Sequence, residues 1–448
     1  MNKENVCLIS LGCPKNLVDS EVILGHLTSD RFNITNDEEQ ADILIINTCA
    51  FISDAQEESI DTILEATHFK EEGSCKLLIV CGCLPQRYQA DLAKELPEVD
   101  IFMGTGDAIR IVELIDEYRA SKQQLQAVSA PKTLHDHTTP RVKASPFYTS
   151  YVKIAEGCSN CCSYCIIPQL RGPLRSRTIA SVVAEVEASV KAGVKEINLI
   201  AQDITAFGHD LNDGSTLEKL LHELVQINDL QWIRLLYAYP DGVTDGLIDL
   251  IASEEKICNY LDLPLQHIDD TILTKMNRRI DEQQLRALIQ RIRQRVPNIT
   301  LRTSFIVGFP GETDTQFNKL LDFVNEGHFD RVGAFCYSQE DGTSAAQMEH
   351  QIDEELKQQR QQQIMEAQSV ISQDKHHALL GQEIDVLVDG FSEETDLLLQ
   401  GRYRGQAPDV DGIVYITAGQ PNIGDIVTIT VTDTTEYDLI GEMVGEGE

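Results

Sequence analysis

Strand-length runs of hydrophobic residues alternate with helical patterns over the first 120 residues of the chain. Uninterrupted apolar runs predict buried strands at residues 6–11, 43–46 and 77–81. Helical spacing of apolar positions follows each run, at residues 17–27, 52–69 and 86–96. Strands and helices that alternate in this way form parallel sheets covered by helices. We therefore expect an N-terminal α/β domain over residues 1–120.

The same alternation returns after a polar stretch. Residues 121–146 contain three prolines and no periodicity, which is typical of a linker. Between residues 147 and 380, candidate strands lie at residues 152–155, 196–200, 232–237, 260–263, 300–307 and 331–335. Six such βα units predict a full or partial β/α barrel, whose chemistry belongs at the carboxyl ends of its strands.

The last part of the chain changes to short alternating runs. They lie at residues 384–388, 412–417 and 426–431, separated by Gly, Pro, Asn and Asp. This pattern predicts a small antiparallel β-barrel over residues 381–448. The whole chain is thus expected to be an α/β protein of three domains.

The chain is acidic and carries no membrane signal. It has 448 residues, of which 42% are hydrophobic, and a net charge of −35. No apolar run reaches the roughly 18 residues that span a bilayer, and the start lacks a secretory pattern. We therefore expect a cytoplasmic protein with no membrane partner. Its charge repels nucleic-acid phosphates and favours a basic protein partner, or serves solubility alone.

Twelve cysteines in a reducing compartment indicate metal binding or catalysis rather than disulfides. Cys158, Cys162 and Cys165 lie on one short loop directly after the first strand of the central domain. Three thiolates can hold three corners of a cubane iron–sulfur cluster and leave one iron open for a chelating ligand such as S-adenosylmethionine (SAM). Cys161 offers a second triad with Cys158 and Cys165, and a structural zinc site is the alternative interpretation.

Three further cysteines lie far apart in sequence but hold equivalent positions relative to predicted strands. Cys13, Cys49 and Cys83 each follow a predicted strand of the N-terminal domain. The carboxyl ends of parallel strands meet at one edge of a sheet, so these thiols can converge on a second cluster. Three unconnected buried thiols are the alternative.

The sequence motifs around these cysteines resemble those of the methylthiotransferase family of the radical SAM superfamily. The resemblance rests on CSNCCSYC (158–165) with Tyr164, IPQLRGPLRSR (167–177), SFIVGFPGET (304–313) and the three N-terminal cysteines. It implies two [4Fe–4S] clusters, SAM, a radical SAM barrel and a C-terminal TRAM barrel. It also implies a reductant such as flavodoxin or ferredoxin, and it leaves the sulfur donor unidentified.

In that family the cluster on the central loop reduces SAM, and a carbon radical takes hydrogen from the substrate. The N-terminal cluster carries the sulfur, which a further SAM methylates. The expected SAM contacts are Tyr164, Arg171, Gln202, Asp203, Gly308 and Gly311. Several of these have plainer roles open to them: Asp203 as a helix N-cap, the two glycines as turn residues and Arg171 as part of a solvated basic face.

Two branches of the family differ in substrate. Two sequence segments, SLGCPKNLVDSE (10–21) and NTCAFI (47–52), resemble one branch of the family. That branch modifies the β-carbon of an aspartate in the twelfth small-subunit ribosomal protein. Residues 383–448 hold two Arg against 15 Asp and Glu, a net charge of −13, which suits a basic protein loop better than RNA. We therefore expect a ribosomal protein or ribosomal subunit as substrate, with adenosine in tRNA as the alternative.

Overall fold

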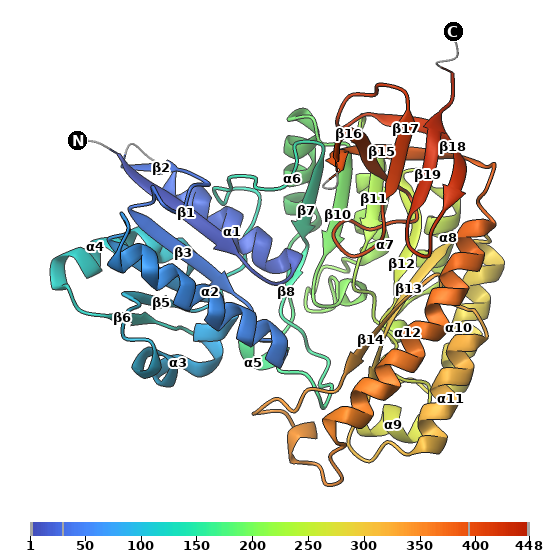
Figure 1. The fold of residues 1–448 in the computed structure, drawn as a ribbon, viewed down its shortest axis with the longest axis horizontal. Helices are drawn as coiled ribbons and strands as arrows, with labels where there is room; N and C mark the ends of the chain where they lie inside the picture. Colours follow the sequence, from blue (N-terminus) through green and yellow to red (C-terminus); the bar gives the residue numbers. More distant parts are fainter. Residues whose placement is uncertain (1–2, 29–30, 393–394, 446–448) are drawn as a thin grey trace.

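The computed structural model describes residues 3–28, 31–392 and 395–445. Figure 1 shows three units in chain order: an α/β domain, a central sheet with helices on its outer side, and a small barrel packed on one end of that sheet. The three expected units are therefore present. Within the described residues, no helix is long and apolar enough to cross a bilayer.

The N-terminal domain is built on a six-stranded parallel sheet in the order β2-β1-β3-β4-β5-β6. Its strands are β1 (Glu4–Ser10), β2 (Phe32–Ile34), β3 (Ile43–Thr48), β4 (Leu77–Gly82), β5 (Ile101–Met103) and β6 (Leu125–Ala127). Its helices are α1 (Pro14–Leu27), α2 (Ser53–Glu71), α3 (Cys83–Glu95) and α4 (Ile111–Ser121). Every residue of β3 and β4 is buried, because helices cover both faces of the sheet.

The three predicted strands of this domain correspond to β1, β3 and β4, which are neighbours in the sheet. The other three strands have three residues each, too few to leave a pattern in the sequence. One of them, β6, pairs with β5 and lies inside the stretch 121–146 that was predicted as a linker. The N-terminal sheet therefore extends to Ala127.

The central domain is a six-stranded parallel sheet in the order β14-β13-β12-β11-β10-β7. Its strands are β7 (Thr149–Lys153), β10 (Glu196–Ile200), β11 (Trp232–Leu235), β12 (Ile257–Asp262), β13 (Thr300–Val307) and β14 (Arg331–Cys336). All six predicted strands are found. In the described residues, β7 and β14 are the two edges of this sheet, so the barrel is partial rather than full.

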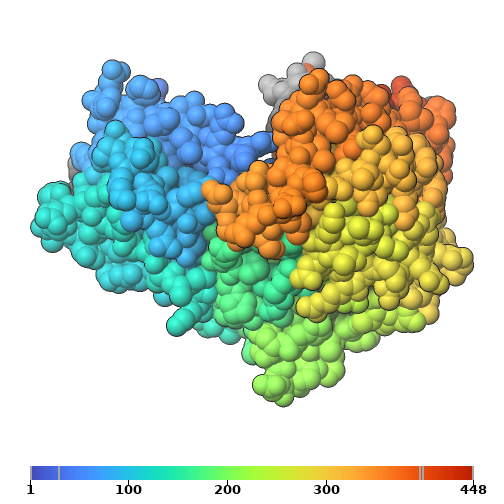
Figure 2. Space-filling model, turned by 90° about the horizontal axis from the view of Figure 1, so that it is seen from below, coloured from blue at the N-terminus to red at the C-terminus, as the bar shows by residue number. Residues whose placement is uncertain are grey.

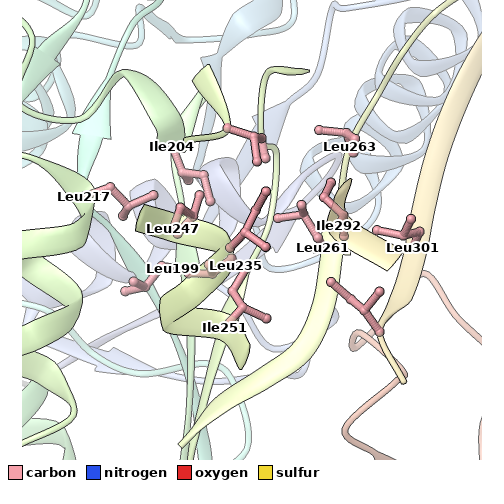
Figure 3. Packing of buried hydrophobic residues seen from close by; sticks show 14 of the residues in the cluster. Leu199, Ile204, Leu217, Leu235, Leu247, Ile251, Leu261, Leu263, Ile292 and Leu301 are labelled. Atoms are coloured by element: carbon pink, nitrogen blue, oxygen red, sulfur yellow. The ribbon is translucent and has the colours of Figure 1, made fainter. Parts of the chain in front are cut away.

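Helices cover the outer face of this sheet. They are α6 (Ile179–Lys191), α7 (Leu217–Leu224), α8 (Asp245–Ser253), α9 (Asp270–Lys275), α10 (Glu282–Arg295), α11 (Asp314–Asn325) and α12 (Glu354–His377). Leucine and isoleucine side chains from strands and helices, such as Leu199, Leu235, Leu261, Ile251 and Ile292, fill the space between the layers (Figure 3). The short elements near the site are β8 (Ala155–Glu156), α5 (Ile167–Arg171) and β9 (Arg175–Ser176), with 3₁₀ turns at Ala108–Arg110, Ile204–Ala206, Pro240–Gly242 and Ala345–Gln347.

The C-terminal unit is a closed barrel in the order β15-β16-β17-β19-β18. Its strands are β15 (Glu383–Ser392), β16 (Thr395–Tyr403), β17 (Val414–Ala418), β18 (Ile426–Thr434) and β19 (Leu439–Met443). The predicted barrel is confirmed, but the β17–β19 pair is parallel. An odd number of strands cannot alternate in direction around a closed ring, so one parallel pair is required.

The N-terminal domain contacts the segment that follows β14 in the central domain. The carboxylate of Glu340 accepts from Arg87 Nη1 at 2.6 Å and from Gln56 Nε2 at 3.0 Å, and the ion pair is buried. In Figure 2 the orange segment that follows β14 lies directly against the blue N-terminal domain. These contacts join the segment after β14 to the edge of the N-terminal sheet that carries the cysteines.

Candidate active site

All six predicted cluster cysteines line one cavity of about 700 Å³ between the domains. The N-terminal sheet contributes Cys13, Cys49 and Cys83, and the central domain contributes Cys158, Cys162 and Cys165. The barrel also reaches this cavity, through Asp409 and Val410. The tertiary structure therefore brings together two three-thiol sets that the sequence separates widely.

The N-terminal set lies at the carboxyl ends of three neighbouring strands. Cys13 is the N-cap of α1, Cys49 follows β3, and Cys83 opens α3 directly after β4. Gly12 has φ +84°, and a Cβ placed on it would stand 2.7 Å from Cys49 Cβ. Only glycine both adopts this backbone conformation readily and leaves Cys49 room beside Cys13.

The second set lies on the loop between β8 and α5. Gly157 begins the loop with φ +79°, and a Cβ there would meet Pro173 O at 2.2 Å. The loop is held from both sides: Cys158 N donates to Gly172 O at 3.0 Å, and Ser163 N donates to Met276 O at 3.0 Å. Backbone bonds thus fix the loop independently of any bound group.

The structure separates the two adjacent cysteines of this loop. Cys162 lines the cavity, whereas Cys161 is exposed to solvent and lies outside the lining. Asn277 Nδ2 donates to Cys161 O at 2.6 Å and holds the backbone in this orientation. The geometry favours the triad with Cys162 over the alternative with Cys161.

The donor set of the cavity suits iron–sulfur clusters. Its lining contains six thiols, no histidine and the single carboxylate of Asp409. No three His, Cys, Asp or Glu side chains of the described residues converge on a single metal ion. A cubane presents separate irons at its corners to separate thiolates. Burial raises the pKa of Cys49 and of Cys165 to about 12, so the thiols must release protons to bind iron.

Arg171, one of the expected SAM contacts, lines the cavity and is not part of a solvated basic face. Its guanidinium is buried and donates to Asp19 Oδ2 at 2.5 Å, to Asn16 Oδ1 at 2.5 Å and to Cys83 Sγ at 3.5 Å. Lys153 Nζ completes a buried network through Asp19 and Glu156, each at 2.5 Å. Burial alone would raise the pKa of Asp19, but Lys153 and Arg171 outweigh it and lower that pKa.

Two of the other expected SAM contacts line the cavity. Tyr164 lies between Cys162 and Cys165, and Gln202 follows the strand β10. Gln202 Nε2 donates to Glu156 Oε1 at 2.9 Å. Its Oε1 is buried with no hydrogen-bond partner among the described residues. Gln202 therefore presents an unused acceptor where a ligand amine or hydroxyl can bind.

The remaining three expected contacts lie outside the cavity lining. Asp203 caps the 3₁₀ turn at Thr205 N, 3.0 Å away, and accepts from Asn160 of the cysteine loop at 2.7 Å. Gly308 and Gly311 have positive φ and form a turn. A Cβ on Gly308 would stand 2.3 Å from Lys357 Cγ, so this glycine permits close packing against α12. Contact between these three residues and SAM stays a prediction.

Several cavity residues had no signal in the sequence. Arg278 is buried, with its guanidinium 4.0 Å from the Tyr239 ring centroid and Nη1 4.0 Å from Cys162 Sγ. Lys15 Nζ lies 3.0 Å from the centroid of Tyr237. Tyr237 has φ +68°, a strained conformation for a large side chain that is found at functional sites. The sequence does give a weak signal for Lys15, because it closely follows Cys13. Arg278 comes near Cys162 only through folding.

Comparison with known families assigns each unit of the chain. Residues 5–104 match the family described as "Uncharacterized protein family UPF0004". Residues 152–324 match the radical SAM superfamily, and residues 380–444 match the TRAM domain. Radical SAM proteins use SAM and a [4Fe–4S] cluster, which agrees with the three thiols on the loop after β8.

Relatives cover the chain from end to end. A protein of Syntrophotalea carbinolica named ribosomal protein uS12 methylthiotransferase RimO is 63% identical over 100% of this chain and 98% of its own length. Its namesake in Geobacter sulfurreducens is 58% identical over 99% of both chains, and that of Bdellovibrio bacteriovorus is 47% identical over 99% of this chain and 98% of its own.

Solved structures share the fold at low sequence identity. The radical SAM methyltransferase TsrM of Kitasatospora setae superposes with a TM-score of 0.56 at 15% identity, over 74% of this chain and 73% of its own. The cobalamin-dependent radical enzyme OxsB gives a TM-score of 0.52 at 12% identity, over 81% and 56%. The fold, the six cavity thiols and the full-length relatives lead to one assignment: the chain belongs to the uS12 methylthiotransferase family and is a radical SAM methylthiotransferase.

Proposed function

We propose that this enzyme adds a methylthio group to the β-carbon of an aspartate in ribosomal protein uS12, in the cytoplasm. The proposal rests on the names of its full-length relatives and on one structural observation. That observation is the single cavity faced by both three-thiol sets. A group transfer between two metal centres requires such shared access, because radical and sulfur must reach the same substrate atom.

We further propose two [4Fe–4S] clusters, one on Cys13, Cys49 and Cys83 and one on Cys158, Cys162 and Cys165. Three thiols per set leave one corner of each cluster open. When bound, the central cluster with SAM would supply the radical chemistry, and the N-terminal cluster would carry the sulfur from a donor that is not identified. A reductant such as flavodoxin or ferredoxin supplies the electrons.

The chain's own residues position and shield the reactants. Gln202 offers its free Oε1 to SAM, and Tyr164 packs beside the central thiols. Arg278 brings a buried positive charge to Cys162. The cavity lies between the domains, and exclusion of water from the reacting carbon by its lining would protect a radical from side reactions. No conventional acid–base pair is needed for these roles.

A protein loop suits the entrance better than RNA does. Phe51 of the N-terminal domain and Val410 of the barrel are both exposed and both line the cavity, so they form an apolar rim. The barrel behind Val410 belongs to a segment of net charge −13, which repels tRNA phosphates and attracts a basic ribosomal protein.

The test uses the anaerobically reconstituted enzyme with SAM, sulfide and reductant. One reaction receives a peptide that contains the target loop of uS12, and a parallel reaction receives a tRNA anticodon stem-loop. Mass spectrometry is expected to find a methylthio mass gain on the aspartate of the peptide and none on the RNA. A gain on adenosine alone would overturn the proposed substrate.

A further inference from the structure

Arg171 connects the two cysteine sets physically. It is the last residue of α5, the short helix that begins two residues after Cys165 of the central set. Its guanidinium reaches Cys83 Sγ of the N-terminal set, with Nη2 and the sulfur 3.5 Å apart. One side chain thus lies on the helix that follows one cysteine set and contacts a thiol of the other.

The orientation of this guanidinium is fixed by three acceptors. Nη1 donates to Asp19 Oδ2 and Nη2 to Asn16 Oδ1, both at 2.5 Å, and these two partners lie on α1. The third is Cys83, and the side chain of Arg171 is only 4% exposed. These partners hold the planar guanidinium with Nη2 directed at the sulfur.

A donor aimed at a ligating sulfur changes the electronics of an iron–sulfur cluster. One-electron reduction adds a negative charge that spreads onto the thiolates, and hydrogen bonds to those sulfurs stabilise the reduced form. We propose that Arg171 raises the reduction potential of the cluster on Cys13, Cys49 and Cys83. Arg171 is then a positioning residue that acts through Cys83, and this role rests on the proposed ligand set.

Lys153 provides a matched comparison within the same network. It carries the same charge, is equally buried and pairs with the same Asp19, at 2.5 Å. It also pairs with Glu156 at 2.5 Å, but among the described residues no hydrogen bond joins it to a cysteine. Loss of either cation removes one positive charge from the four-residue network of Asp19, Lys153, Glu156 and Arg171. Only loss of Arg171 also removes the hydrogen bond to sulfur.

The experiment uses a full-length chain with Cys158, Cys162 and Cys165 replaced by Ala, so that only the N-terminal set can hold a cluster. Arg171→Gln, Arg171→Lys or Lys153→Gln is added, and each protein is reconstituted anaerobically. Its cluster is titrated with dithionite and followed by electron paramagnetic resonance of the reduced form. We expect the midpoint potential of Arg171→Gln to be the most negative, with Arg171→Lys intermediate and Lys153→Gln closest to the parent.

An unmoved potential in Arg171→Gln, or an equal shift in Lys153→Gln, would overturn the role of Arg171 and leave the proposed function intact. If Arg171→Gln holds no iron, Arg171→Lys decides, and its unmoved potential would likewise overturn the inference. A parent chain that binds no cluster would contradict the proposed ligand set and this inference with it.

Discussion

Arg402 of the C-terminal barrel donates from Nη2 to Glu196 Oε2 at 2.9 Å, and both side chains are buried. Glu196 begins β10 of the central sheet, and Arg234 on the neighbouring strand β11 donates to its Oε1 at 3.1 Å. Asp389 of the barrel balances the second positive charge, 2.8 Å from Arg402 Nε. The barrel that forms part of the cavity rim is therefore anchored through a buried, charge-balanced contact.

The first prediction concerns the strength of this anchor. Glu196→Gln leaves two buried arginines with one carboxylate, and breaking a buried ion pair costs about 3 kcal/mol. We expect the free energy of unfolding, from urea titrations followed by circular dichroism, to fall by about that amount. Lys195→Gln is the control, because Lys195 also joins the barrel, at Asp425, but through an exposed pair worth less than about 1 kcal/mol. Equal losses in the two variants would contradict the prediction.

The second prediction concerns pH. Burial alone would raise the pKa of Glu196, but Arg402 and Arg234 outweigh it and hold the pKa at about 2. A carboxyl whose folded pKa is depressed stabilises the protein above its unfolded pKa, about 4.3, and loses this effect as the pH falls. The stability difference between wild type and Glu196→Gln should be constant from about pH 7 to pH 5 and shrink below about pH 4. Urea midpoints of both proteins across this range measure it, and a constant difference down to about pH 3 would count against the assignment.

The third prediction tests how Gly12 shapes the N-terminal thiol set. Gly12→Ala places a methyl group 2.7 Å from Cys49 Cβ, so Cys13 and Cys49 must move apart. Iron in the reconstituted protein should fall from about eight to about four atoms per chain, as one of two cubanes is lost. Gly327→Ala is the control, since Gly327 also has positive φ but open space around its Cβ position. Full iron content in Gly12→Ala would show that the site tolerates the methyl group.

The fourth prediction concerns Arg278. Its guanidinium stacks on Tyr239 and donates from Nη2 to Pro264 O at 2.5 Å, which keeps the charge beside Cys162. Arg278→Lys cannot stack and donate in the same geometry, and loss of a preorganised donor slows reactions about 100-fold. Deoxyadenosine formation from SAM should fall by about this factor with iron content unchanged. Arg279→Lys, at the exposed neighbouring position, should keep the wild-type rate.

The fifth prediction separates the two adjacent cysteines. Cys162→Ala should lose the central cluster and all SAM cleavage while the N-terminal cluster and the fold remain, because the loop is held by its own backbone bonds. Cys161→Ala should retain both, since its thiol is exposed outside the cavity. Iron analysis and circular dichroism measure the two effects. Unfolding of Cys162→Ala would instead indicate a purely structural cluster.

The sequence alone determined the three units, the buried strands long enough to carry a pattern, and both cysteine sets. Thiols at strand ends are recognisable because parallel strands end at a common edge, whatever the length of chain between Cys13, Cys49 and Cys83. The sequence alone did not reveal the three-residue strands, because their pairing depends on neighbours in the sheet. Nor did it determine the parallel pair of the barrel, which follows from closing a ring of five strands.

Only the tertiary structure decided which polar residues reach the cavity. Arg171, Asp203, Gly308 and Gly311 were all expected as SAM contacts from the sequence motifs. Folding places Arg171 in the cavity lining with its guanidinium on Cys83 and the other three outside the lining, so which of them contacts SAM stays a prediction. Arg278 approaches Cys162 across 116 residues of sequence. The direction of a side chain depends on the long-range partners that satisfy its charge and hydrogen bonds, and no local pattern specifies those partners.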